Sequence, residues 1–217
     1  MKFARRSFLA HTLSVGMAPA ILLSKPRTYK VCIIGATGRG NYGHGLDVAW
    51  KNILGTQVVA VADTHKAGLS SALKRNSCQQ GYEDYRKMLA IEKPDFISIC
   101  PRHVDQRVPM IEAACENGVK GIYTEKPFAR TMEECDQIEK VCQQTGTKIA
   151  VAHRNRYHPA LPVVRRLIQE GAIGKVVALR GRGKEDHRGG GEDLWVLGTH
   201  VFDLVNAIAG DPVSCSA

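Results

Sequence analysis

Short runs of apolar residues alternate with amphipathic stretches through most of this 217-residue chain. The apolar runs are rich in valine, isoleucine and alanine, as expected of strands that are covered on both faces. They predict strands at residues 31–34, 57–62, 96–100, 121–124 and 148–152. The stretches between them repeat apolar residues at helical spacing and predict helices at residues 46–53, 66–75, 82–89, 104–117 and 132–144.

This regular order of strands and helices favours a parallel sheet with helices on both faces. With right-handed crossovers, it predicts a doubly wound α/β domain of the Rossmann type, which binds dinucleotides. The local signals agree, because Thr131 and Glu134 form a capping-box pattern and Gly118 is a typical helix stop. We expect this domain to span residues 28–152.

The rest of the chain, residues 153–217, predicts little regular structure. Its pattern indicates a helix at 159–169, a strand at 174–180, a charged glycine-rich loop at 183–193 and a helix at 198–209. One strand between two helices is too little for an independent domain. We therefore expect a partial second domain, the start of an open-sheet α/β unit that is truncated in the protein or in its recorded sequence.

A glycine-rich turn follows the first predicted strand and contains Gly35, Thr37, Gly38, Arg39 and Gly40. The backbone amides of such a turn, with a helix N-terminus behind them, form a binding site for pyrophosphate. The dinucleotide fingerprint has glycine at its first, third and sixth positions, and Thr37 occupies the third here. We expect Arg39 to contact a phosphate. Taken alone, the pattern also fits an ordinary strand–helix turn.

Asp63 ends the second predicted strand. A carboxylate there accepts hydrogen bonds from the ribose hydroxyls of NAD and repels the 2′-phosphate of NADP. NAD is therefore the favoured cofactor, although His65 and Lys66 nearby would tolerate a phosphate and keep NADP open. The alternative is that Asp63 is an ordinary helix N-cap.

The tripeptide Glu125-Lys126-Pro127 follows the predicted strand at 121–124. Ligands of parallel sheets bind beyond the carboxyl ends of the strands, so this turn is expected to border the site. A lysine there can stabilise negative charge on a substrate oxygen. The alternative is a surface turn held by a salt bridge.

Charge and cysteine usage exclude several other functions. The net charge is +9, but residues 1–27 hold five basic residues and no acidic one, and no basic run is interleaved with aromatic residues. A nucleic-acid partner is therefore not expected. The seven cysteines are odd in number and form no C-x-x-C pair, so neither a metal site nor a disulfide framework is indicated.

The N-terminal 27 residues are typical of an export signal. Arg5-Arg6-Ser7-Phe8-Leu9 forms a twin-arginine pattern, a modestly apolar stretch follows, and Ala18-Pro19-Ala20 offers a cleavage site. We expect export by the twin-arginine route to the periplasm or another extracytoplasmic space, without stable membrane insertion, because the apolar stretch is short and interrupted. A disordered basic tail is the alternative.

The chain resembles the Gfo/Idh/MocA family of oxidoreductases (glucose–fructose oxidoreductase, inositol dehydrogenase and rhizopine catabolism proteins). The segments that carry the resemblance are VCIIGATGRG, VVAVADTHKAG, GYEDYRKML, DFISICPRHVDQ, GIYTEKPFA, HRNRYHPA, EGAIGKV and LGTHVFDLVNAIAGDP. The resemblance implies a Rossmann domain followed by an α/β domain that carries the substrate site and often the oligomer interface. It implies a small carbohydrate-like substrate and, for a full-length protein, a homo-oligomer.

The resemblance also implies roles for individual residues. Lys126 matches the lysine that meets both substrate and nicotinamide, and His200 matches the histidine that takes a proton from the substrate hydroxyl. Glu125, Pro101 and Arg102 match positions beside the cofactor. The expected substrate contacts are Arg154, Arg156 and Asp203.

One departure from the family pattern bears on the chemistry. Characterised dehydrogenases of the family carry an aspartate four residues before the histidine, and Val196 stands there in this chain. The acidic residues that are candidates to replace it are Asp186, Glu192, Asp193 and Asp203.

Three functions therefore stay open. The first is an NAD(P)-dependent oxidoreductase that transfers a hydride to or from a sugar, cyclitol or related polyol. The second is an NAD-dependent glycoside hydrolase of the same family. The third is an NAD-binding paralogue without catalysis.

Overall fold

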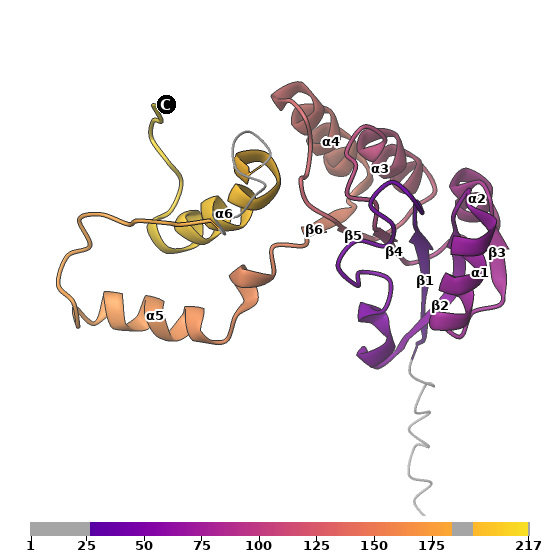
Figure 1. The fold of residues 1–217 in the computed structure, drawn as a ribbon, viewed down its shortest axis with the longest axis horizontal. Helices are drawn as coiled ribbons and strands as arrows, with labels where there is room; N and C mark the ends of the chain where they lie inside the picture. The colour runs from indigo at the N-terminus through magenta and orange to yellow at the C-terminus, as the bar shows by residue number, and fades with distance from the viewer. Residues whose placement is uncertain (1–26, 184–192, 217) are drawn as a thin grey trace, which may run out of the picture.

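The computed structural model describes residues 27–183 and 193–216, and a six-stranded sheet forms its centre (Figure 1). The strands are β1 (Tyr29–Ile34), β2 (Thr56–Ala62), β3 (Gln80–Tyr82), β4 (Phe96–Ile99), β5 (Gly121–Thr124) and β6 (Lys148–Val151). All neighbours pair in parallel, in the order β3-β2-β1-β4-β5-β6. This is the Rossmann order, with its topological switch between β1 and β4. The predicted fold class is confirmed.

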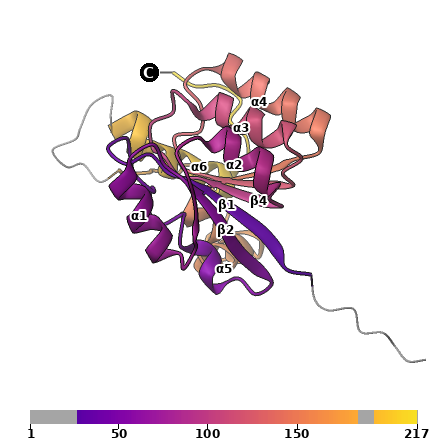
Figure 2. The ribbon, with the colours of Figure 1, turned by 90° about the vertical axis from the view of Figure 1, so that its right-hand side faces the viewer.

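Helices cover both faces of the sheet, and Figure 2 shows α3 and α4 on the opposite side from α1. The α-helices are α1 (Lys66–Arg75), α2 (Tyr85–Glu92), α3 (Arg107–Glu116), α4 (Met132–Thr145), α5 (Ala160–Gln169) and α6 (Gly198–Ala209). Three short elements are the 3-10 turns η1 (Ala49–Asn52) and η2 (Arg154–Tyr157) and the π-helical turn η3 (Asp193–Leu197).

The core has two layers because successive residues of each strand point to opposite faces. Ile34 of β1 packs in one buried cluster with residues of α2, α3 and α4, among them Met88 and Ile111. Ile33, its neighbour, packs in the other cluster with Ala72 of α1. The predicted cap of α4 is also present, since Thr131 accepts a hydrogen bond from the Glu134 backbone N–H at 3.3 Å.

The helix predicted at residues 46–53 is not formed, and this is a correction of the sequence pattern. Residues 38–48 instead make a series of turns that ends in η1. Asn41, Gly43 and Gly45 all have positive φ values, of 54°, 61° and 86°, which a right-handed helix does not tolerate. The glycine-rich segment is therefore an extended loop, and its backbone leads from β1 across to the end of β5.

Two other predicted elements differ. The helix predicted at 82–89 begins later, as α2, because Asp84 caps it by accepting from the Arg86 backbone N–H. The strand predicted at 174–180 is absent from the described residues, which place no neighbouring strand beside it. Val177 there is 90% exposed.

The second part of the chain extends beyond β6, where Figure 1 shows α5 and α6 away from the helices that cover the sheet. Residues 1–26 of the signal predicted at 1–27, and residues 184–192 of the glycine-rich loop predicted at 183–193, lie outside the described residues. No helix in the described part of the chain has the length and apolar character needed to span a membrane.

Candidate active site

The glycine-rich turn is tied to the end of β2 by Asp63. The Asp63 carboxylate accepts from the Thr37 hydroxyl at 2.7 Å, from the Thr37 backbone N–H at 3.1 Å and from the His65 backbone N–H at 2.9 Å. The Tyr42 hydroxyl donates to it at 2.9 Å. Asp63 is 2% exposed, so these donors enclose it. The N-cap of α1 is His65, whose Nδ1 accepts from the Gly68 N–H, rather than Asp63.

Tyr42 closes the loop back onto its own start. Its ring lies against Gly35, where any Cβ atom would clash with it, so this position requires glycine. Burial and the hydrogen bond to Asp63 raise the pKa of the Tyr42 hydroxyl well above its ordinary value, which keeps it a donor. Thr37 thus stabilises the turn through its hydroxyl group, which a glycine at this fingerprint position would not have.

An arginine-rich cavity of about 650 Å³ lies beside this turn. Its lining includes the following residues: Arg39, Arg102, His103, Asp105, Pro127, Arg130, Trp195 and Val196. Arg39 pairs with Asp105 at 2.6 Å, with both side chains about half exposed. Arg130 likewise pairs with Glu134. With Arg102, the lining still has more basic than acidic side chains, which suits phosphate groups.

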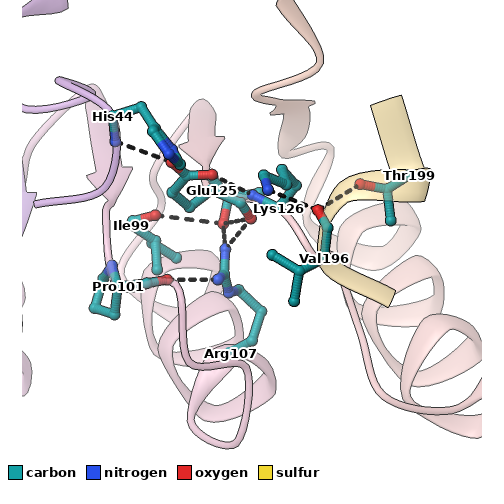
Figure 3. A network of polar contacts seen from close by, with 9 residues as sticks. His44, Ile99, Pro101, Arg107, Glu125, Lys126, Val196 and Thr199 are labelled. Atoms are coloured by element: carbon teal, nitrogen blue, oxygen red, sulfur yellow. Dashed lines mark hydrogen bonds and ion pairs between the residues drawn. The ribbon is translucent and has the colours of Figure 1, made fainter. Parts of the chain in front are cut away.

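Glu125 and Lys126 are buried at the end of β5, 1% and 3% exposed. Figure 3 shows Glu125 between the glycine-rich loop and Lys126. Its Oε2 accepts from the Lys126 backbone N–H at 2.8 Å, and its Oε1 accepts from the His44 backbone N–H at 3.0 Å and contacts the His44 ring. The loop approaches so closely that a Cβ on Gly43 would lie 2.6 Å from the Glu125 Cγ.

Arg107, on α3, holds the backbone of this turn through hydrogen bonds. The sequence analysis did not identify this residue. It is 1% exposed, and its guanidinium donates to the Pro101 carbonyl at 2.6 Å and to the Thr124 hydroxyl and the Glu125 carbonyl (Figure 3). Burial lowers its pKa to about 10, opposed by the charge of Glu125. Arg107 thereby joins the carboxyl ends of β4 and β5 and holds Pro101 and Glu125 at a fixed separation.

Lys126 reaches from β5 to the second part of the chain. Its Nζ donates to the Val196 carbonyl at 2.7 Å (Figure 3). A second cavity of about 480 Å³ opens here, lined by Lys126, His200, Arg154, His44, Tyr123 and Arg182 among others. Arg102 and Val196 line both cavities, which therefore adjoin.

His200, on α6, lines this second cavity beside Lys126. Burial, the nearby positive charge of Lys126 and the His153 ring lower the pKa of His200 below its ordinary value of 6.5. The imidazole is consequently neutral at pH 7 and able to accept a proton. The structure thus brings together the two residues, Lys126 and His200, that were predicted to be catalytic.

The predicted substrate residues separate into two groups. Arg154 lines the second cavity. Arg156 points instead to α6, where its Nε donates to Asp203 Oδ1 at 2.7 Å, and Nη2 donates to Asn206 Oδ1 at 3.2 Å. Asp203 lies within 3.3 Å of the His153 ring. Arg156 and Asp203 therefore join β6 and η2 to α6 behind the cavity wall.

Sequence analysis also missed His44 and His153. His44 lies in the glycine-rich loop, whose turns bring its side chain to Glu125, 81 residues away in the sequence. His153 follows β6 and meets Asp203 fifty residues later. In each case the partner is distant in the sequence, so no local pattern marks the residue.

The described residues fit a nicotinamide dinucleotide at two of its three parts. Arg39, Arg102 and Arg130 supply a positive lining for the pyrophosphate, and the adjoining cavity with Lys126 provides room for the reactive end. At the adenosine end, Asp63 is enclosed by Thr37 and Tyr42, so the predicted contact with ribose hydroxyls stays a prediction and requires one of them to give way.

Comparison with known proteins agrees with this geometry. A profile of the Gfo/Idh/MocA family, described as an oxidoreductase family with an NAD-binding Rossmann fold, matches residues 29–153. D-apiose dehydrogenase of Paraburkholderia graminis is 28% identical over 179 residues, which cover 78% of this chain and 47% of that protein. The NAD⁺-dependent scyllo-inositol 2-dehydrogenase of Bacillus subtilis is 28% identical over 153 residues, 69% of this chain and 43% of that protein.

Solved structures share the fold. Scyllo-inositol dehydrogenase of Lactobacillus casei, solved with NAD(H) and scyllo-inositol, superposes with a TM-score of 0.73 at 18% identity. The superposition covers 85% of this chain and 57% of that one. The chain therefore spans about half the length of the relatives that it matches.

Proposed function

Because the chain belongs to the Gfo/Idh/MocA family of NAD-binding oxidoreductases, we propose that it transfers a hydride between NAD and a CH–OH carbon of a sugar, cyclitol or related polyol. The relatives named above, dehydrogenases of apiose and inositol, support this substrate class. The chain spans about half the length of these relatives, so their activity comes to this chain as a proposal.

The observation that carries the proposal is the pairing of Lys126 and His200 in one cavity, next to an arginine-lined one. Bound NAD would supply the hydride acceptor. The Lys126 ammonium donates to the reacting oxygen and stabilises the negative charge that develops there. The neutral His200 imidazole accepts the hydroxyl proton. Arg102, shared by the two cavities, lies between the phosphate-binding and reactive ends.

The experiment has two parts. The purified protein is denatured and the released material is analysed by mass spectrometry, and binding of NAD and NADP is measured by calorimetry. Turnover is then followed by the absorbance of reduced nicotinamide over a panel of sugars and cyclitols. We expect NAD binding, and a loss of at least a hundredfold in turnover for Lys126→Met with NAD binding retained. Lys148→Met, which alters an exposed lysine of β6, is the matched control.

The same assay separates the alternatives. NAD-dependent cleavage of an aryl glycoside, without accumulation of reduced nicotinamide, would contradict net hydride transfer and support the glycoside hydrolase reaction instead. Val196, in place of the usual aspartate, keeps that outcome in the test. A protein that binds NAD but turns over no substrate, and whose NAD binding and lack of turnover are the same in Lys126→Met, would contradict both reactions.

We further propose that the protein is exported by the twin-arginine route. The Arg5-Arg6-Ser7-Phe8-Leu9 pattern and the absence of acidic residues before Tyr29 support this. A fusion of residues 1–27 to a reporter that is active only after folded export tests it. Arg5→Lys combined with Arg6→Lys is expected to abolish export, and export that survives this change would contradict the route.

A further inference from the structure

Three buried polar atoms next to the second cavity have no hydrogen-bond partner among the described residues. They are Nε2 of His153, Nδ1 of His200 and Oδ2 of Asp203. An unpaired buried polar group costs free energy, and such groups are rare in folded proteins. A cluster of them requires an explanation, and the contact between the two imidazole rings provides one for the two nitrogens.

The carboxylate of Asp203 defines which nitrogen of His153 carries its proton. Asp203 Oδ1 lies 3.3 Å from His153 Nδ1 and accepts from Arg156 Nε at 2.7 Å. A carboxylate only accepts hydrogen bonds, so the His153 nitrogen that faces it carries the hydrogen. The other nitrogen, Nε2, then holds the lone pair, and it is the buried and unpaired one.

The His153 ring lies against the His200 ring. Their centroids are 5.7 Å apart and their planes meet at 70°, so the contact is edge to face. His200 lines the cavity, whereas His153 and Asp203 lie behind it, with side chains 21% and 8% exposed. Because Nδ1 of His200 is buried, Nε2 is the nitrogen that it offers to a molecule in the cavity.

We propose that His153 and Asp203 form a carboxylate–imidazole pair that fixes the tautomer of His200, with the hydrogen on His200 Nδ1 and the lone pair on Nε2. The link is a hydrogen bond from His200 Nδ1 to His153 Nε2, which joins two of the unpaired atoms when the neighbouring rings turn towards each other. Hydrogen bonds of this kind are often long in the unliganded protein and shorten when substrate binds. This inference rests on the proposed function for its use in catalysis.

The pair supplies what Val196 cannot. A carboxylate at position 196 would contact His200 from one helical turn away, whereas Asp203 acts through His153 from the following turn. The charged groups around His200 are Lys126, Glu125 and Arg154 at the cavity and Arg156 and Asp203 behind it. His153 and Asp203 are therefore positioning residues, because they act on the substrate only through His200.

The tautomer is measured directly by two-bond ¹H–¹⁵N correlation spectra of the uniformly labelled full chain. We expect His200 in the Nδ1–H form at neutral pH. His153→Phe keeps the ring shape but removes both nitrogens, and Asp203→Asn removes the acceptor charge. Both variants are expected to move His200 towards the Nε2–H form, which free imidazole side chains prefer. His158→Gln, on the same segment but bonded to the Ala160 N–H, is the matched control.

Turnover is measured for the same variants. We expect kcat to fall about 10- to 100-fold in His153→Phe with KM nearly unchanged, and the acid limb of the pH profile to move. A wild-type His200 in the Nε2–H form, or a tautomer unchanged in both variants, would overturn the proposal, whatever the activity. The expected tautomers in a protein that oxidises no sugar or cyclitol would support the pair and contradict the proposed function instead.

Discussion

Lys126 is bonded to the backbone of Val196: its Nζ donates to the Val196 carbonyl at 2.7 Å. Position 196 therefore meets the lysine through its carbonyl, which does not depend on the side chain. The valine removes a carboxylate from the neighbourhood of His200 but leaves the contact between β5 and the turn before α6 intact. The side chain at position 196 can therefore be changed without removing the hydrogen bond that places Lys126.

Restoring a carboxylate at this position should change His200. We expect Val196→Asp to raise the pKa of His200, because a nearby negative charge favours the imidazolium. An NMR titration of the His200 ring measures this. Val196→Asn has the same shape without the charge and is expected to leave the value close to that of the wild type. An equal shift in both variants would show that polarity rather than charge is responsible.

Two glycines of the loop provide a matched pair for measuring how close the loop must approach Glu125. Gly43 and Gly45 have φ values of 61° and 86°, so alanine is strained at both, by about 1–2 kcal/mol. Only Gly43 faces Glu125, with the Cγ 2.6 Å from an added Cβ, whereas at Gly45 the nearest atom is 3.6 Å away. We expect Gly43→Ala to lower the free energy of unfolding by at least 1 kcal/mol more than Gly45→Ala does.

Denaturant unfolding of the two variants measures that difference. Gly43→Ala is also expected to weaken turnover, since the loop holds Glu125 beside Lys126, while Gly45→Ala is expected to retain it. Equal destabilisation by the two substitutions would mean that the loop moves away from β5 at little cost.

The Asp63 carboxylate is expected to contribute to stability through its hydrogen bonds. Four donors surround it, and Asp63→Asn would turn an amide N–H₂ towards some of them, which leaves buried donors unpaired. We expect a loss of about 1–3 kcal/mol in the free energy of unfolding. Asp84→Asn is the control, because asparagine is as good as aspartate at the N-cap of α2.

Calorimetry of Asp63→Asn tests the ribose contact separately. If Asp63 also binds the ribose, the folded Asp63→Asn variant binds NAD with lower affinity than the folded wild type does. A protein as stable as the wild type would contradict the structural role of the carboxylate.

The depressed pKa of His200 predicts a dependence of stability on pH. The unfolded chain binds a proton near pH 6.5, whereas folded His200 does so only at lower pH. Below about pH 6.5 the unfolded state therefore binds more protons, and this contribution to the free energy of unfolding declines until the pH reaches the folded pKa. His200→Gln is expected to flatten the profile between pH 7 and 5. An unchanged profile would show that His200 is not buried as described.

The sequence by itself determined five of the six strands and most of the helices, whereas the edge strand β3 was not predicted. The central strands β1 and β4 are buried on both faces, so their apolar runs had to be nearly continuous. The elements α1, β5 and α4 begin where the pattern predicted. It also placed Lys126 at a strand end, because the tripeptide Glu125-Lys126-Pro127 follows β5 directly. These features depend on residues that are neighbours in the chain.

Tertiary structure decided the rest. The segment at 46–53 has helical spacing, yet it forms only the 3-10 turn η1. Positive φ values at Asn41, Gly43 and Gly45 make the residues before it a loop that reaches Glu125. Arg107 and His153 had no local signature, because Arg107 reaches Thr124 and Glu125, 17 and 18 residues away, and His153 reaches Asp203. A buried charge is tolerated only where backbone and side-chain groups from distant parts of the chain form hydrogen bonds to it. Folding brings these groups together, so no short stretch of sequence predicts them.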